Sequence, residues 1–124
     1  MILVFGGACQ GKRAFVQRQF SLREEEIGSL RRDGEGDWSQ PALGGLEEYL
    51  LGCRERGEDP AATPLEGEGV EGKILICREI SSGIVPIDPL MRRWQEENGR
   101  LLQRLAHRSS QVWRVFCGIP QRLK

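Results

Sequence analysis

The chain has 124 residues, enough for one domain with a single hydrophobic core. Its 18 basic and 18 acidic residues give a formal net charge of zero, so charge offers no argument for binding to nucleic acid or to an anionic membrane surface. One histidine and four widely separated cysteines, with no C-x-x-C pair, make a structural zinc site unexpected. No run approaches the roughly 20 apolar residues of a membrane-spanning helix, and the N-terminal run is too short for a signal segment. We therefore expect a cytoplasmic protein with reduced thiols.

The first part of the chain combines a short apolar run with a glycine-rich loop. Residues 1–5, Met-Ile-Leu-Val-Phe, predict a buried strand, and a helix is expected over about 11–20. The segment between them fits the phosphate-binding pattern G-x-x-x-x-G-K, in which backbone N–H groups and the lysine contact phosphate oxygens. The predicted nucleotide-binding residues are Gly6, Gly7, Ala8, Cys9, Gln10, Gly11, Lys12 and Arg13. The alternative is a strand–helix turn that is merely rich in glycine.

Arg13 is a departure from this pattern. The pattern continues with Ser or Thr, whose hydroxyl binds magnesium, so Mg²⁺ lacks one of its usual ligands here. Arg13 can be interpreted as a fixed cation near the phosphates or as an outward-pointing helix residue. The expected ligand is ATP or GTP, and no residue pattern distinguishes the two bases.

The middle of the chain is rich in glycine and glutamate, at about 21–72. Residues 21–41 predict a loop with a short edge strand around Ile27–Leu30. A helix is expected over about 42–56, and Gly57 is expected to end it. The apolar positions that predict this helix are Leu43, Leu46, Leu50 and Cys53. Residues 57–72 predict a surface loop.

The C-terminal part predicts two more strands and a long helix. Lys73–Cys77 is a short apolar run typical of a buried parallel strand, and 112–117 predicts the last strand, ended by Gly118 and Pro120. Asp88 is expected to cap a helix over about 89–107 that begins at Pro89. The predicted apolar face of this helix consists of Leu90, Met91, Trp94, Leu101, Leu102 and Leu105.

The order of these elements predicts an α/β sandwich around a small, mostly parallel sheet, in one domain spanning residues 1–124. Parallel strands end at the same edge, so three segments should meet there: the glycine loop, residues 78–83 and residues 118–121. Glu79 could serve as a metal partner or a general base, or it could be a solvated acid paired with Arg78. Arg92, near the start of the long helix, is the best placed of the helix arginines to reach an anionic ligand.

Three blocks of sequence resemble one family. Met1-Ile2-Leu3-Val4 and the loop through Lys12 form the first block, Arg78-Glu79-Ile80-Ser81-Ser82-Gly83-Ile84-Val85-Pro86 the second, and 112–124 with Gly118-Ile119-Pro120 the third. In this order they are similar to the bifunctional adenosylcobinamide kinase/adenosylcobinamide-phosphate guanylyltransferases of cobalamin biosynthesis. The resemblance implies a P-loop fold of the RecA-like type, shortened in the middle, and a homo-oligomer, with a trimer as the family's assembly. It also implies a cobinamide-type substrate, near which Arg92 and Gly83 would lie.

The departures from the family determine the expected activity. The family carries its guanylyl group on a histidine, whereas this chain has no histidine before His107, so guanylyltransfer is expected to be lost. The remaining reaction would transfer a phosphoryl group to the aminopropanol hydroxyl of a cobinamide, with Lys12 and Glu79 as catalytic residues. The alternative is a non-catalytic paralogue that holds a nucleotide or a corrinoid for a partner.

Overall fold

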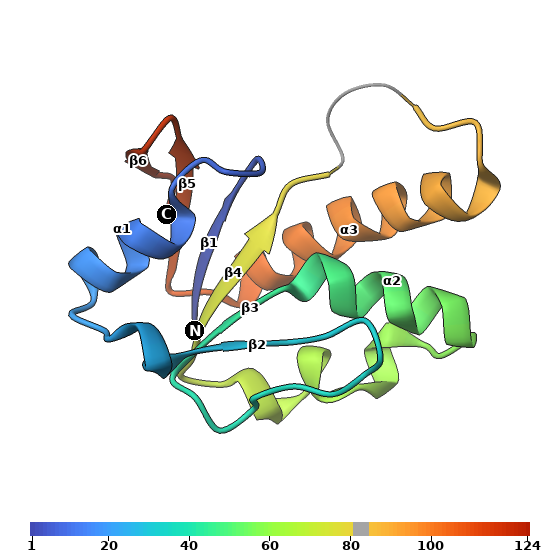
Figure 1. Ribbon diagram of the computed structural model, residues 1–124, viewed down its shortest axis with the longest axis horizontal. Coiled ribbons are helices and arrows are strands. Elements are labelled where there is room, and N and C mark those ends of the chain that lie inside the picture. The colour runs from blue at the N-terminus through green and yellow to red at the C-terminus, as the bar shows by residue number, and fades with distance from the viewer. Residues whose placement is uncertain (81–84) are drawn as a thin grey trace.

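The computed structural model describes residues 1–80 and 85–124 of the chain (Figure 1). Gly83, a predicted substrate contact, lies outside the described residues, as do Ser81, Ser82 and Ile84. The strands are β1 (Ile2–Gly6), β2 (Ile27–Ser29), β3 (Ala42–Gly44), β4 (Ile74–Arg78), β5 (Gln111–Phe116) and β6 (Ile119–Arg122). The α-helices are α1 (Lys12–Gln19), α2 (Leu46–Arg56) and α3 (Pro89–Arg108).

The six strands form one sheet in the order β2-β3-β4-β1-β5-β6. The first five are parallel, and β6 returns antiparallel to β5. In the central register Leu3 of β1 lies opposite Leu75 of β4 and Val112 of β5. β1 is thus a central strand, and the glycine loop follows directly after it. The loop therefore lies at the edge of the sheet where the parallel strands end. This arrangement confirms the predicted α/β fold of the P-loop type.

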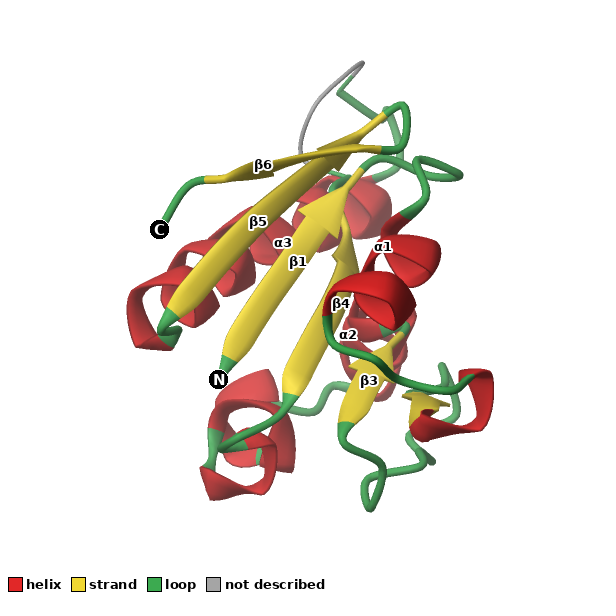
Figure 2. Ribbon diagram, turned by 90° about the vertical axis from the view of Figure 1, so that its left-hand side faces the viewer, coloured by secondary structure: helices red, strands yellow, loops and turns green. Residues whose placement is uncertain are grey.

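Helices cover both faces of the sheet (Figure 2). Side chains alternate along β1, so that Leu3 packs in the core beneath α2 and α3, whereas Val4 packs in the core beneath α1. Both residues are at most 1% exposed. The continuous apolar sequence of β1 and β4 follows from this burial on two faces.

Several expected element boundaries are confirmed. The first strand and first helix lie where the sequence predicted them, and Ile27–Ser29 forms an edge strand. Asp88 caps α3, its Oδ1 accepting a hydrogen bond from the Leu90 N–H at 2.8 Å. Gly57 ends α2 in a left-handed conformation, and its N–H donates to the carbonyl of Arg54.

The prediction that residues 42–56 form one helix was wrong at its start. Residues 42–44 are strand β3, which pairs with β2 on one side and β4 on the other. Ala42 and Leu43 are fully buried, and the helix begins two residues after the strand ends. A strand of three residues is too short to show a period of two, and Leu43 also falls in the helical spacing of α2.

The expectation that 118–121 forms a loop was also wrong. Cys117 and Gly118 both have positive φ, as in a two-residue hairpin turn, and β6 follows immediately. Pro120 lies in β6 at the edge of the sheet, where a residue without an N–H is tolerated. The predicted surface loop 57–72 contains three short 3₁₀ helices, which bury Leu65 and Val70 completely.

The apolar face of α3 contains most of the predicted residues. Leu101 and Leu105 are fully buried, and Trp94 and Leu102 are partly buried against the same core. The polar Asn98 is also fully buried. Asn98 accepts a hydrogen bond from the Ile80 N–H at 3.3 Å and donates to Cys77 Sγ at 3.5 Å. None of the helices within residues 1–80 and 85–124 combines the length and the hydropathy of a membrane-spanning segment.

Candidate functional site at the glycine loop

The glycine loop is packed tightly between β1 and α1. Gly6 ends β1, and a Cβ at this position would lie 2.3 Å from the backbone oxygen of Val115 in β5. Gly11 precedes α1 in a left-handed conformation, and its carbonyl accepts the Phe15 N–H at 3.0 Å. The helix therefore begins at Lys12, with its first N–H groups directed towards the loop.

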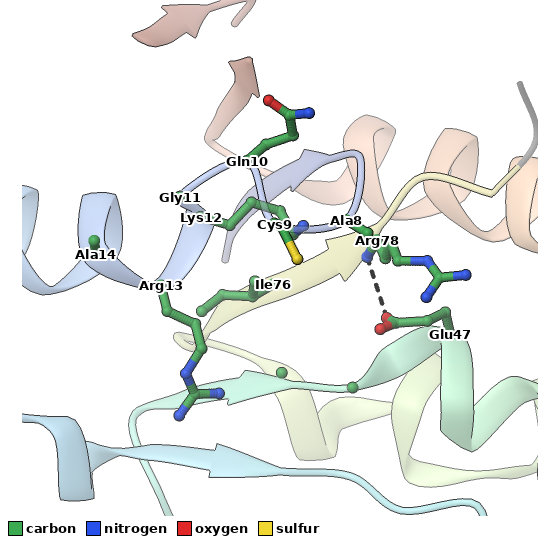
Figure 3. Close-up of a pocket in the computed structure, with 12 residues that line it drawn as sticks. Ala8, Cys9, Gln10, Gly11, Lys12, Arg13, Ala14, Glu47, Ile76 and Arg78 are labelled. Atoms are coloured by element: carbon green, nitrogen blue, oxygen red, sulfur yellow. Dashed lines mark hydrogen bonds between the residues drawn. The ribbon is translucent and has the colours of Figure 1, made fainter. Parts of the chain in front are cut away.

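A cavity of about 380 Å³ lies beside the loop (Figure 3). Its walls come from the loop, the first turn of α1, the end of β3, the start of α2 and the end of β4. The lining residues are Ala8, Cys9, Gln10, Gly11, Lys12, Arg13, Ala14, Gly44, Gly45, Glu47, Ile76 and Arg78. Six of the eight predicted nucleotide-binding residues are among them, whereas Gly6 and Gly7 lie just before the lining segment.

Lys12 is held over the glycine loop. Its Nζ donates a hydrogen bond to the carbonyl oxygen of Gly7 at 2.6 Å, which leaves the ammonium two further N–H donors. Partial burial lowers the pKa of Lys12 from its ordinary value, and the nearby Glu47 carboxylate acts in the opposite direction. The loop thus holds a partly desolvated cation where the motif requires one.

Glu47 is the site residue that the sequence analysis missed. It lies in the first turn of α2, and its Oε2 accepts a hydrogen bond from the Arg78 N–H at 3.1 Å, drawn as a dashed line in Figure 3. Two acidic residues, Glu47 and Glu48, stand in the first turn of α2, and acids in this position favour the start of a helix. The predicted helix began at residue 42, so both acids fell outside its first turn.

Glu79 is not among the residues that line the glycine-loop cavity. Its N–H donates to the Gly6 carbonyl at 2.8 Å, so its backbone joins the loop as predicted. It lines a neighbouring cavity of about 470 Å³, which shares Ala8 and Arg78 with the first. The other residues of this second cavity are Ile80, Pro86, Met91, Trp94 and Gln95.

The third predicted segment reaches the loop through the β5–β6 turn. Oε1 of Gln10 accepts the N–H of Cys117 at 2.5 Å, and the carbonyl of Gln10 accepts the N–H of Gly118 at 2.9 Å. For the described residues the expected meeting of three segments at one edge therefore occurs, through Glu79 of the second segment and Gly118 of the third. The third segment contributes backbone groups at 117–118, because residues 119–122 continue as β6.

The two predicted arginines occupy different surroundings. Arg13 extends along the cavity towards β3, and its Nη2 lies 3.5 Å from the Ile27 carbonyl oxygen (Figure 3). Arg92 is exposed in the first turn of α3 and lies outside the lining of both cavities. Within the described ranges 1–80 and 85–124, no group of three or more His, Cys, Asp or Glu side chains is placed to hold a metal ion.

The C-terminal half of the chain is similar to known proteins. Residues 67–123 match the model of the family described as cobinamide kinase/cobinamide phosphate guanyltransferase. A segment of 51 residues is 39% identical to the bifunctional adenosylcobalamin biosynthesis protein CobU of Salmonella typhimurium, and 37% identical to the protein of that name from Escherichia coli. Each match covers 41% of this chain and 28% of the relative.

The family match and the glycine-loop cavity overlap in part. Arg78, Glu79 and Arg92 lie inside the matched range, whereas the loop, Arg13 and Glu47 precede it. The structure connects the two parts, since β4 and β5 of the matched range flank β1 in the sheet. Residues 67–123 thus carry the sequence pattern of the cobinamide kinase/cobinamide phosphate guanyltransferase family, which confirms the resemblance for its second and third blocks.

Proposed function

We propose that this chain binds the phosphate groups of a purine nucleoside triphosphate, ATP or GTP, in the glycine-loop cavity. The observation that carries the proposal is the position of Lys12, partly buried and hydrogen-bonded across the loop between β1 and α1. Backbone N–H groups at a helix start and a lysine at this position are the usual ligands of β- and γ-phosphates. The match of residues 67–123 supports a role in cobalamin biosynthesis.

The first candidate reaction is transfer of the terminal phosphoryl group to the aminopropanol hydroxyl of a cobinamide. The adjoining cavity supports it, because it shares Ala8 and Arg78 with the phosphate cavity and is lined by Glu79. A carboxylate beside the transferred group could accept the proton of the attacking hydroxyl. Arg92 and Gly83 are the proposed contacts with this substrate, on the basis of the family resemblance alone.

The second candidate is nucleotide binding without catalysis. Arg13 in place of a magnesium-binding hydroxyl favours it, since loss of a metal ligand impairs phosphoryl transfer more than phosphate binding. We also propose that guanylyltransfer is absent. His107 lies near the end of α3, and the N–H of Ser110, three residues later, donates a hydrogen bond to the carbonyl of Met1, just before β1. The histidine is therefore at the edge of the sheet opposite the glycine loop.

We propose in addition that the protein forms a homo-oligomer, with a trimer as the state suggested by the resemblance. The proposal rests on the C-terminal hairpin, in which β6 forms one edge of the sheet and apolar side chains are exposed. Phe116 at the end of β5, Ile119 in β6 and Leu123 just after it are 61%, 69% and 53% exposed. Light scattering coupled to gel filtration tests this, and a monomer at all accessible concentrations would exclude it.

Equilibrium dialysis with radiolabelled ATP and GTP tests the binding proposal. A turnover assay with cobinamide distinguishes its two versions, the kinase and the non-catalytic binding protein. Binding together with formation of cobinamide phosphate would establish the kinase. Binding without turnover would establish the binding protein. Absence of binding to either nucleotide would exclude both versions.

A further inference from the structure

A magnesium ion in a P-loop site is held by two protein groups. One is the hydroxyl that follows the loop lysine, and the other is an aspartate at the end of a neighbouring strand. In this chain the first position is Arg13. Two strand ends line the cavity. β3 ends in Gly44, which supplies no side chain, and β4, the strand beside β1, ends in Arg78, after which Glu79 lies outside this lining. Neither strand end therefore brings a carboxylate into the described lining.

The guanidinium of Arg13 lies against the end of β3. A Cβ built on Gly44 would lie 3.3 Å from Nη1 of Arg13 and 3.9 Å from Cβ of Ile76. The other terminal nitrogen, Nη2, lies 3.5 Å from the Ile27 carbonyl oxygen, which is a long hydrogen bond. Arg13 thus holds a permanent positive charge above the end of β3, on the α1 side of the sheet.

The remaining acid of the cavity does not replace the missing ligands. One oxygen of Glu47 is already bonded to the Arg78 N–H. Three cationic side chains, Lys12, Arg13 and Arg78, share the described lining with this one carboxylate. Such a lining suits a bare polyanion better than a divalent cation with its oxygen ligands. The residues present therefore do not fit a magnesium site.

We infer that Arg13 takes the place of the magnesium ion, so that the site binds the metal-free triphosphate. This inference rests on the proposed function. Lys12 and the loop N–H groups hold the β- and γ-phosphates, and Arg13 leaves its long contact with Ile27 to make paired hydrogen bonds to phosphate oxygens. Magnesium then competes with the protein for the same oxygens.

The test is calorimetric titration with the non-hydrolysable ATP analogue AMP-PNP, once in EDTA and once in excess magnesium chloride. We expect the wild-type protein to bind more tightly in EDTA. The Arg13→Ser variant should lose about tenfold in affinity in EDTA. The double variant R13S/G44D introduces the hydroxyl and a strand-end carboxylate, and its binding should then require magnesium. Arg18→Ser, at an exposed position of the same helix, is the matched control and should bind like wild type.

The outcomes separate this inference from the function on which it rests. Wild-type binding that disappears in EDTA would overturn the inference and leave nucleotide binding intact. Unchanged affinity of Arg13→Ser in EDTA would overturn it as well. Absence of binding under both conditions would instead overturn the proposed function. Thermal melts of every variant show whether the fold is retained. If Arg13→Ser proves unstable, Arg13→Lys takes its place. This variant keeps the charge and should retain part of the affinity in EDTA.

Discussion

The side-chain oxygen Oε1 of Gln10 accepts a hydrogen bond from the backbone N–H of Cys117 at 2.5 Å. The two residues are 107 positions apart in the sequence, and they join the glycine loop to the β5–β6 turn. A second hydrogen bond, from the Gly118 N–H to the Gln10 carbonyl, joins the same two segments. The conformation of the loop therefore depends on the C-terminal hairpin.

The Gln10→Ala variant removes the side-chain half of this connection. We expect the free energy of unfolding to fall by about 1 kcal/mol, which is the usual contribution of one hydrogen bond. ATP affinity should fall as well, because the loop N–H groups lose their fixed orientation. Urea unfolding and calorimetric titration measure the two effects. Gln121→Ala, at an exposed position of β6, is the control, and an equal loss in both variants would contradict the assigned role of Gln10.

Glu47 and Glu79 make opposite predictions for nucleotide affinity. Glu47 lines the glycine-loop cavity, and its charge opposes that of bound phosphates. Glu47→Gln keeps an oxygen for the Arg78 N–H and removes the charge, so we expect ATP to bind several-fold more tightly. Glu79→Gln changes the neighbouring cavity and should leave ATP affinity unchanged. If Glu79→Gln proved to be the variant that alters binding, the placement of the phosphates would be wrong.

Lys12 should make the free energy of unfolding depend on pH in the alkaline range. Burial lowers its pKa in the folded protein, so between that pKa and the ordinary value of 10.5 the unfolded chain binds more protons than the folded chain. The free energy of unfolding contributed by Lys12 therefore rises with pH through this window. Lys12→Met removes the effect and should stabilise the fold at neutral pH. Urea unfolding from pH 7 upward compares the two proteins, and parallel profiles would show that Lys12 is not desolvated.

Gly52, in the middle of α2, tests the packing of α2 against the preceding loop. Helix propensity alone predicts that Gly52→Ala stabilises the protein by about 1 kcal/mol. A Cβ at this position would lie 1.8 Å from the backbone oxygen of Arg32, so we expect destabilisation by about 2 kcal/mol or more instead. Thermal unfolding measures the sign. Gly67→Ala, whose Cβ would meet only ordinary contacts, should stay within about 0.5 kcal/mol of wild type.

The sequence predicts the central elements of this fold because their local signals are strong. Met1–Phe5 is continuously apolar and precedes a glycine loop, and Asp88-Pro89 is a helix start that depends only on neighbouring residues. The short strand β3 carries no such signal. Its three residues become a strand because β2 and β4 pair with it, and that pairing depends on contacts more than ten residues away.

The residues of the candidate site likewise fall into those that a local motif predicts and those whose position depends on the tertiary structure. Lys12 and the loop follow from a contiguous motif, and their convergence with residues 78–79 follows from parallel strand ends. The role of Glu47 depends on where α2 begins. The position of Glu79 directly after β4 does not reveal which of two neighbouring cavities it lines. The burial of Asn98 was not predicted for a related reason. A polar residue within a helix is expected to be exposed unless its hydrogen-bond partners, here Ile80 and Cys77, are known.

Titration of ATP and GTP into the wild-type protein and the Lys12→Met variant, by isothermal calorimetry, tests the central claim most directly. We predict that the wild type binds at least one of the two nucleotides with a dissociation constant in the micromolar range, and that Lys12→Met weakens this binding by about tenfold or more while remaining folded. Equal affinity of the two proteins, or heat of binding from neither, would contradict the assignment of the glycine loop as a phosphate site.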